Sequence, residues 1–244
     1  MAAFTDLEYA ERLTRTRTEM ARRSLDVLVV TDPANMNYLT GYDAWSFYVP
    51  QAVIVGLNEE APLWVGRGMD AASAVITTSL PRENILGYAD EYVESTTRHP
   101  MQYVAQVLTE RGWASASIGY ESDAYHFTAR FLDVLRESLP SARLVDAYLL
   151  VNWIRTVKSE AEIMVMRQAA RIVERVMRVA VDAVNVGTRE CDAAALIAAA
   201  QIAGTPEFGG DGPALYPAIL SGAKAATPHS AWSDEPFRTN HGSA

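Results

Sequence analysis

The sequence predicts an α/β protein, more closely an α+β arrangement, with one complete domain followed by the start of a second. Over roughly the first 155 residues, short β-branched segments alternate with helical ones, a pattern typical of a mixed sheet with flanking helices. One long amphipathic helical segment follows. The remainder of the 244-residue chain holds too little strand to cover the apolar side of that helix, although such a side must pack against another element.

Composition places the chain among ordinary globular proteins. Hydrophobic residues make up 49% and charged residues 21%, with a net charge of −9. This acidic balance argues against nucleic-acid binding, which needs a basic surface. The single cysteine, Cys191, excludes an intrachain disulfide and a Cys-based zinc finger. No apolar run reaches the roughly 18 residues of a membrane span, and the N-terminus has no signal-peptide core. We therefore expect a cytoplasmic protein with no membrane partner.

A helix and a buried strand open the first domain. Thr5 and Glu8 form a capping-box pattern, in which each side chain satisfies a backbone N–H at a helix start. A helix over about residues 6–24 is expected to follow. Residues 25–30 (LDVLVV) are short and rich in β-branched side chains, which favours a buried strand. Pro33 ends it, because proline cannot donate to a strand ladder.

The rest of the first domain continues the alternation. Two strands, residues 51–57 and 63–65, flank the polar turn 58–62, so we expect a hairpin. The same periodicity rules predict helices over residues 69–77, 99–111 and 124–138 and strands over residues 117–121 and 143–145. Together these elements predict a first domain of residues 1–155.

The second domain, residues 156–244, opens with a long helix. Ser159 and Glu162 form another capping box, and the helical pattern extends to about residue 184. Its apolar residues recur every three or four positions and form one stripe: Ile163, Met166, Ala170, Val173, Met177, Ala180 and Val184. The stripe implies a partner surface that this chain does not contain, so we expect the second domain to be incomplete.

Less structure is predicted after the long helix. Gly187 ends it, and Thr188 can cap a second helix over residues 189–203. Residues 216–220 have the character of a strand, and a polar, irregular segment follows. This remainder is small for a domain of its own.

His229 is the candidate catalytic residue. It follows residues 221–228 (SGAKAATP), whose glycine and proline mark a loop leaving the predicted strand, and loops of this kind often display catalytic groups. Imidazole exchanges protons near neutral pH, so one loop histidine suffices as a general acid or base. The four histidines form no H-x-x-x-H or H-E-x-x-H pair, so no helix-borne metal site is predicted.

The densest aromatic cluster spans residues 42–48 (YDAWSFY), after a glycine and between two predicted strands. Aromatic side chains on a loop can form the wall of a small-molecule pocket or pack an interface. They can equally serve as an ordinary hydrophobic plug. The pattern leaves both interpretations open.

Three segments resemble the creatinase/prolidase family, the pita-bread hydrolases. Residues 155–163 (RTVKSEAEI) are similar to the Arg-x-x-Lys pattern that opens the catalytic domain of that family. Residues 219–229 (ILSGAKAATPH) are similar to its Ser-Gly…Pro-His segment, whose histidine faces the active site. Residues 32–42 (DPANMNYLTGY) are similar to a stretch of its N-terminal domain. The resemblance implies a creatinase-type N-terminal domain followed by a truncated pita-bread catalytic domain.

Within the family, residues 41–51, 64–70 and 229–234 look most like the ectoine hydrolases. That branch opens the cyclic amidine of ectoine to N-acetyl-diaminobutyrate. The resemblance implies that His229 shuttles a proton to or from the ring nitrogen, and that catalytic carboxylates lie beyond the chain end. It also implies substrate contacts from an aromatic set, with cation–π interactions to the amidinium: Tyr42, Trp45, Tyr48 and Trp232. A homodimer is implied as well, in which the aromatic loop reaches the neighbouring active site.

Two alternatives remain open. A metal-dependent Xaa-Pro dipeptidase or aminopeptidase would need a pair of divalent metal ions, with aspartates that follow the Pro-His segment in the family. Creatinase and ectoine hydrolase relatives work without metal, so we expect no cofactor. A different class of function is an inactive dimerisation or binding module built on the first domain.

Overall fold

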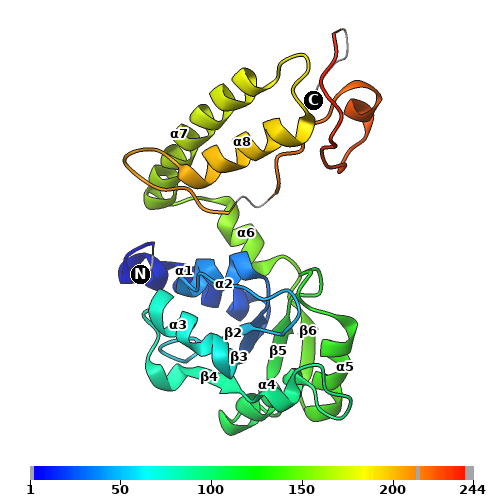
Figure 1. Cartoon of the computed structure of the whole chain (residues 1–244). Helices are drawn as coiled ribbons and strands as arrows, with labels where there is room; N and C mark the ends of the chain where they lie inside the picture. Colours follow the sequence, from blue (N-terminus) through cyan, green and yellow to red (C-terminus); the bar gives the residue numbers. More distant parts are fainter. Residues whose placement is uncertain (1–2, 213–214, 240–244) are drawn as a thin grey trace. The chain divides into compact units, whose positions relative to one another are not determined.

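The computed structural model describes residues 3–212 and 215–239, and the chain divides into two compact units, Met1–Val157 and Lys158–Ala244 (Figure 1). The division falls close to the predicted one between residues 155 and 156. No helix within the described ranges is both long and apolar enough to cross a membrane.

The first unit is built on one mixed sheet of six strands, in the order β4-β3-β2-β1-β5-β6. The strands are β1 (Val27–Val30), β2 (Ala52–Gly56), β3 (Leu63–Arg67), β4 (Ile85–Tyr88), β5 (Ser117–Tyr120) and β6 (Arg143–Asp146). β1 pairs antiparallel with β2 and parallel with β5. β2 and β3 form the predicted antiparallel hairpin, with Val53 opposite Trp64. The predicted mixed sheet is confirmed.

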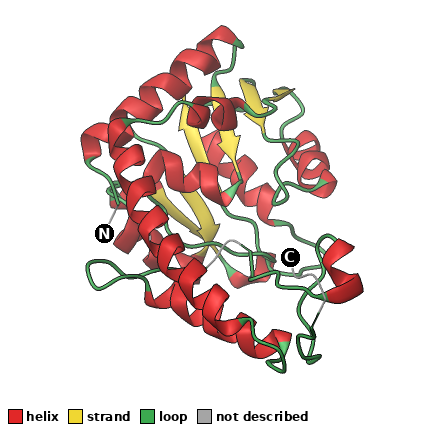
Figure 2. Cartoon of the chain, turned by 90° about the horizontal axis from the view of Figure 1, so that it is seen from above, coloured by secondary structure: helices red, strands yellow, loops and turns green. Residues whose placement is uncertain are grey.

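Helices cover both faces of this sheet (Figures 1 and 2). The helices of the unit are α1 (Asp6–Arg22), α2 (Pro33–Thr40), α3 (Ala71–Thr77), α4 (Pro100–Glu110), α5 (Ala129–Ser138) and α6 (Leu150–Thr156). Alternate strand residues point to opposite faces. Val27 and Val29 therefore pack with α4 and α5, whereas Leu28 and Val30 pack with α1, α2, α3 and α6.

Several predicted boundaries in this unit need correction. Pro33 does end β1, but it also begins α2, which was not predicted, because proline suits the first position of a helix. Asp32 caps this helix, with its Oδ1 accepting from the backbone N of Asn35 at 2.9 Å. The helix predicted from residue 124 begins only at Ala129, capped by Thr128. β4 and α6 were not predicted from the sequence.

The second unit consists mainly of α7 (Glu160–Ala183) and α8 (Glu190–Ala203), which lie side by side (Figure 1). Ser159 and Glu162 form the predicted capping box. Residues 216–220 are irregular and not a strand as predicted. A strand needs a partner to satisfy its backbone, and every strand of the described chain that belongs to the sheet lies in the first unit.

Candidate functional site

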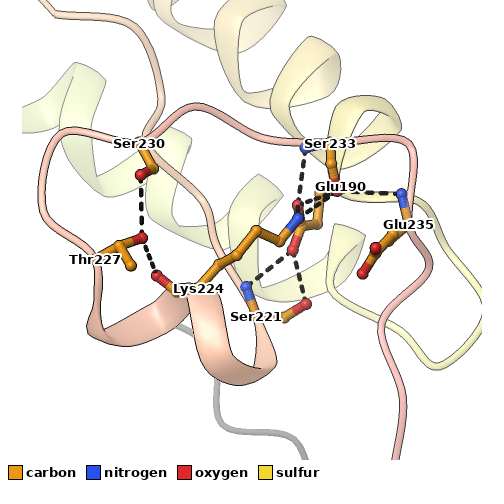
Figure 3. A network of polar contacts seen from close by, with 7 residues as sticks. All are labelled: Glu190, Ser221, Lys224, Thr227, Ser230, Ser233 and Glu235. Atoms are coloured by element: carbon orange, nitrogen blue, oxygen red, sulfur yellow. Dashed lines mark hydrogen bonds and ion pairs between the residues drawn. The ribbon is translucent and has the colours of Figure 1, made fainter.

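The second unit contains a network of hydrogen bonds centred on Glu190 (Figure 3). Glu190 is the first residue of α8 and its side chain is completely buried. Its Oε1 accepts from the backbone N and the Oγ of Ser221 at 2.9 and 2.7 Å. Its Oε2 accepts from the backbone N and the Oγ of Ser233, both at 2.8 Å, and from Nζ of Lys224 at 2.9 Å. One side chain thus contacts both ends of the segment that carries His229.

The charge state of Glu190 follows from this network. Burial alone would raise its pKa, because water no longer solvates the carboxylate. The hydrogen bonds from Lys224, Ser221 and Ser233 outweigh burial and lower the pKa of Glu190 to about 2. Glu190 is therefore ionised at neutral pH and forms an ion pair with the partly exposed Lys224.

Backbone pairing holds the end of the same segment against the start of α8. Arg189 forms an isolated antiparallel bridge with Pro236, and the backbone N of Glu190 donates to the carbonyl of Glu235 at 3.0 Å. The first N–H groups of a helix lack partners within the helix, so this pairing satisfies one of them. The prediction that Thr188 caps this helix is wrong: the N-cap is Arg189, with no side-chain cap bond.

His229, the predicted catalytic residue, has an exposed side chain and a left-handed backbone with φ of 62°. A non-glycine residue in this conformation costs about 1–3 kcal/mol and occurs preferentially at functional sites. The carbonyl of His229 accepts a hydrogen bond from the Tyr216 hydroxyl at 3.2 Å. The Tyr216 ring packs edge-on against Trp232, with centroids 5.5 Å apart. The structure thus places His229 and Trp232, both singled out from the sequence, on one exposed segment.

The other predicted substrate-binding residues lie in the first unit. Trp45 and Tyr48 are exposed between α2 and β2, with 62% of Trp45 accessible. Tyr42 differs, since it is 1% exposed and packs against Trp64 with centroids 5.4 Å apart. Burial raises the pKa of Tyr42 to about 12. Tyr42 is thus part of the core, unlike Trp45 and Tyr48 of the same cluster, and offers a substrate no surface in this unit.

A cavity of about 140 Å³ lies beside the exposed aromatic residues. Phe47, Tyr48 and Phe131 line it together with Thr31 and His126, and its lining includes no carboxylate, lysine or arginine. The Oγ1 of Thr31 and the Nδ1 of His126 are buried there without a hydrogen-bond partner in the protein. The cavity therefore combines apolar and aromatic side chains with uncharged polar ones, a composition that small-molecule pockets can have.

The sequence analysis missed Glu190, and the reason is its long-range contacts. Its donors lie 31 and 43 positions further along the chain, and an acidic residue in the first turn of a helix normally stays in solvent. One weak signal was present: Lys224 is one of only two lysines in the sequence, and it lies within the Ser-Gly…Pro-His segment.

A metal centre finds no support in the residues that the structure describes. Among them, no three His, Cys, Asp or Glu side chains are grouped so that they could hold a metal ion.

Comparison with known proteins supports the resemblance stated above. Residues 12–157 match the creatinase/prolidase N-terminal domain, and residues 165–241 match the metallopeptidase family M24. The chain is 46% identical to the ectoine hydrolase of Halomonas elongata, over 98% of this chain and 61% of that protein. It is 45% identical to an uncharacterized hydrolase/peptidase of Sinorhizobium fredii, over 97% of this chain and 60% of that protein.

The fold agrees with these matches. A prolidase from Thermococcus sibiricus superposes with a TM-score of 0.77 at 17% identity, over 97% of this chain and 60% of that one. The present chain spans about 60% of the length of the curated relatives it matches. With the first unit matched almost from end to end and the second by the M24 family, the chain belongs to the creatinase/prolidase family.

Proposed function

We propose that this protein is a hydrolase that opens the cyclic amidine of ectoine to N-acetyl-diaminobutyrate. The observation that carries the proposal is the 46% identity to an ectoine hydrolase over nearly the whole chain. His229 adds chemical support, because it is an exposed imidazole held in a backbone conformation that is concentrated at functional sites.

In the proposed reaction, water attacks the amidine carbon and the carbon–nitrogen bond of the ring breaks. His229 takes up the proton that the water loses and returns it to the departing ring nitrogen, a role for which imidazole is suited near neutral pH. Trp45, Tyr48 and Trp232 would contact the cationic amidinium through their ring faces. A homodimer would allow the aromatic segment of one subunit to serve the other, and the expected compartment is the cytoplasm.

A metal-dependent Xaa-Pro peptidase is the second candidate, and the match of residues 165–241 to the metallopeptidase family M24 favours it. The two functions differ in substrate and in chelator sensitivity. The longest polypeptide that the gene encodes is incubated with ectoine and with a Xaa-Pro dipeptide, each with and without a chelator. Chelator-resistant turnover of ectoine supports our proposal, whereas intact ectoine with hydrolysed dipeptide overturns it.

His229→Ala tests the assigned role within the same assay. Loss of a general acid should lower kcat by about 10²–10⁴-fold, as measured by the release of N-acetyl-diaminobutyrate. His99→Asn is the control: His99 caps α4 in the first unit, and asparagine is a good cap, so its activity should stay at the level of the unmodified protein. A loss below tenfold in His229→Ala would reduce that residue to a structural role.

A further inference from the structure

Few buried side chains stabilise the conformation of the segment from Ser221 to Ser233. Ser221 is its only buried residue, and its regular structure is the short 3₁₀ turn Gly222–Ala226. Within the segment, Thr227 donates to the Lys224 carbonyl at 2.6 Å and bonds the Ser230 hydroxyl at 3.0 Å (Figure 3). Burial of apolar side chains, the usual source of loop order, is therefore small here.

Glu190 contacts this segment at both ends. Four of its hydrogen bonds come from the backbone and hydroxyl groups of Ser221 and Ser233, and the fifth comes from Lys224 between them. Every partner donates, and an ionised carboxylate only accepts. The amide of a glutamine would turn an NH₂ group toward donors at one end or the other. The arrangement thus requires a carboxylate at position 190 and not merely a polar side chain of that size.

Two direct chemical roles can be set aside. Lys224 also donates to the Ser233 hydroxyl (Figure 3), which resembles a serine nucleophile beside a lysine base. The Nζ that would take the proton is instead an ammonium, paired with the Glu190 carboxylate at 2.9 Å. Glu190 has no surface exposed to solvent and its pKa is about 2, so it neither contacts a substrate nor exchanges protons near neutral pH.

We propose that Glu190 is a positioning residue: a single buried carboxylate that fastens both ends of the Ser221–Ser233 segment to the start of α8 and thereby fixes His229. The left-handed backbone of His229 is consistent with this role, because an unfavourable conformation persists only where the surroundings enforce it. The proposal rests on the proposed function insofar as His229 is the proton donor, but its structural part can be measured without any substrate.

The test is Glu190→Gln with Asp192→Asn as the matched control. Asp192 lies in the same first turn of α8, but its carboxylate is exposed and pairs only locally with Arg189. Hydrogen–deuterium exchange followed by mass spectrometry is measured on both variants. We expect exchange in peptides covering residues 221–233 to accelerate by about tenfold or more in Glu190→Gln, with exchange in α4 and the sheet unchanged. Asp192→Asn should resemble the parent protein.

A second variant keeps the test decisive if Glu190→Gln does not fold. Ser233→Ala removes one hydroxyl donor at one end and leaves the charge pair in place. Exchange should then accelerate in residues 229–235 and not near Ser221. Unchanged exchange in a folded Glu190→Gln, or unchanged exchange in Ser233→Ala, overturns the proposal.

Activity separates positioning from general destabilisation. On ectoine, kcat of Glu190→Gln should fall by about 10–100-fold, since small misplacements of a catalytic group cost this much, with KM changed less than about twofold. Loss of folded protein would also lower the apparent kcat at unchanged KM, so kcat is normalised to the folded fraction measured by circular dichroism. A kcat per folded molecule equal to that of the parent contradicts the assignment. If the parent protein leaves ectoine intact while exchange behaves as expected, the proposed substrate fails and the fastening role of Glu190 stands.

Discussion

At the scale of single residues, two buried carboxylates have pKa values displaced in opposite directions. Glu121 accepts from three neutral donors: the backbone N of Thr31 and of Asp32 at 2.7 and 2.9 Å, and Nδ2 of Asn35 at 2.7 Å. Burial dominates these bonds and raises the pKa of Glu121 to about 7. Glu190 has a cation, Lys224, among its donors, and its pKa falls. The balance between burial and the hydrogen bonds that a carboxylate accepts therefore decides whether it keeps or loses its proton.

The raised pKa of Glu121 predicts a pH-dependent stability. An unfolded chain releases this proton near pH 4.5, whereas the folded protein holds it until about pH 7. The contribution of Glu121 to the free energy of unfolding should therefore be highest below pH 4.5. It should fall by on the order of 3 kcal/mol as the pH rises to 7. Urea unfolding of the parent and of Glu121→Gln at pH 4.5, 6 and 8 measures the difference.

The comparison between variants isolates Glu121 from other titrating groups. The difference in unfolding free energy between the parent and Glu121→Gln should change by on the order of 3 kcal/mol between pH 4.5 and pH 8. For Asp123→Asn, which removes an exposed carboxylate two residues further along, the gap should stay constant. A constant gap for Glu121→Gln as well would show that Glu121 titrates at its ordinary pKa.

At the scale of elements, the apolar stripe predicted on α7 matches the side of the helix that packs only in part. The predicted stripe included Val173 and Met177, but both are exposed. α7 packs on α8 through Ile172 and Val176, which the stripe left out, and through Ala180, which it included. Both sides of the helix are apolar enough to pack, and periodicity alone does not rank them. Ala180 and Val184, at the end of the predicted stripe, do pack within the second unit.

Neighbouring substitutions on α7 should differ sharply in cost. Val176 is 8% exposed and Met177 is 56% exposed. Val176→Ala should lower the unfolding free energy of the second unit by about 2 kcal/mol, since it removes buried methyl groups and leaves a cavity. Met177→Ala should change it by less than about 0.5 kcal/mol. Denaturant unfolding followed by far-UV circular dichroism, which reports the helices, checks both; equal effects would contradict the observed packing.

At the scale of the whole molecule, local signals were predictable and long-range ones were not. The capping residues Thr5 and Ser159 were recognised correctly because a cap and its partner lie three positions apart. The aromatic segment was identified from the sequence. The burial of Tyr42 and the exposure of Trp45 within it were not predictable from the segment itself. Burial of Glu190 depended on residues more than thirty positions away. His229 was found through its motif, and its role stays a prediction.

The distribution of buried hydrophobic clusters predicts which part of the chain folds by itself. Each buried hydrophobic cluster of the described residues draws its members from one unit, and the two large clusters both lie in the first. A fragment of residues 1–157 is of ordinary domain size and keeps every strand of the sheet. We expect it to unfold cooperatively, with the near-UV circular dichroism of the buried Tyr42 and Trp64 pair intact.

A shorter fragment supplies the matched control, because α6 contributes Leu150 and Val151 to the core on one face of the sheet. Residues 1–148 lack both side chains, and each lost buried aliphatic residue costs about 2–5 kcal/mol, comparable with the whole stability of a small domain. This fragment should lose its cooperative transition and its near-UV signal. Cooperative unfolding of 1–148, or a non-cooperative 1–157, would show that the boundary of the folding unit lies elsewhere than at residue 157.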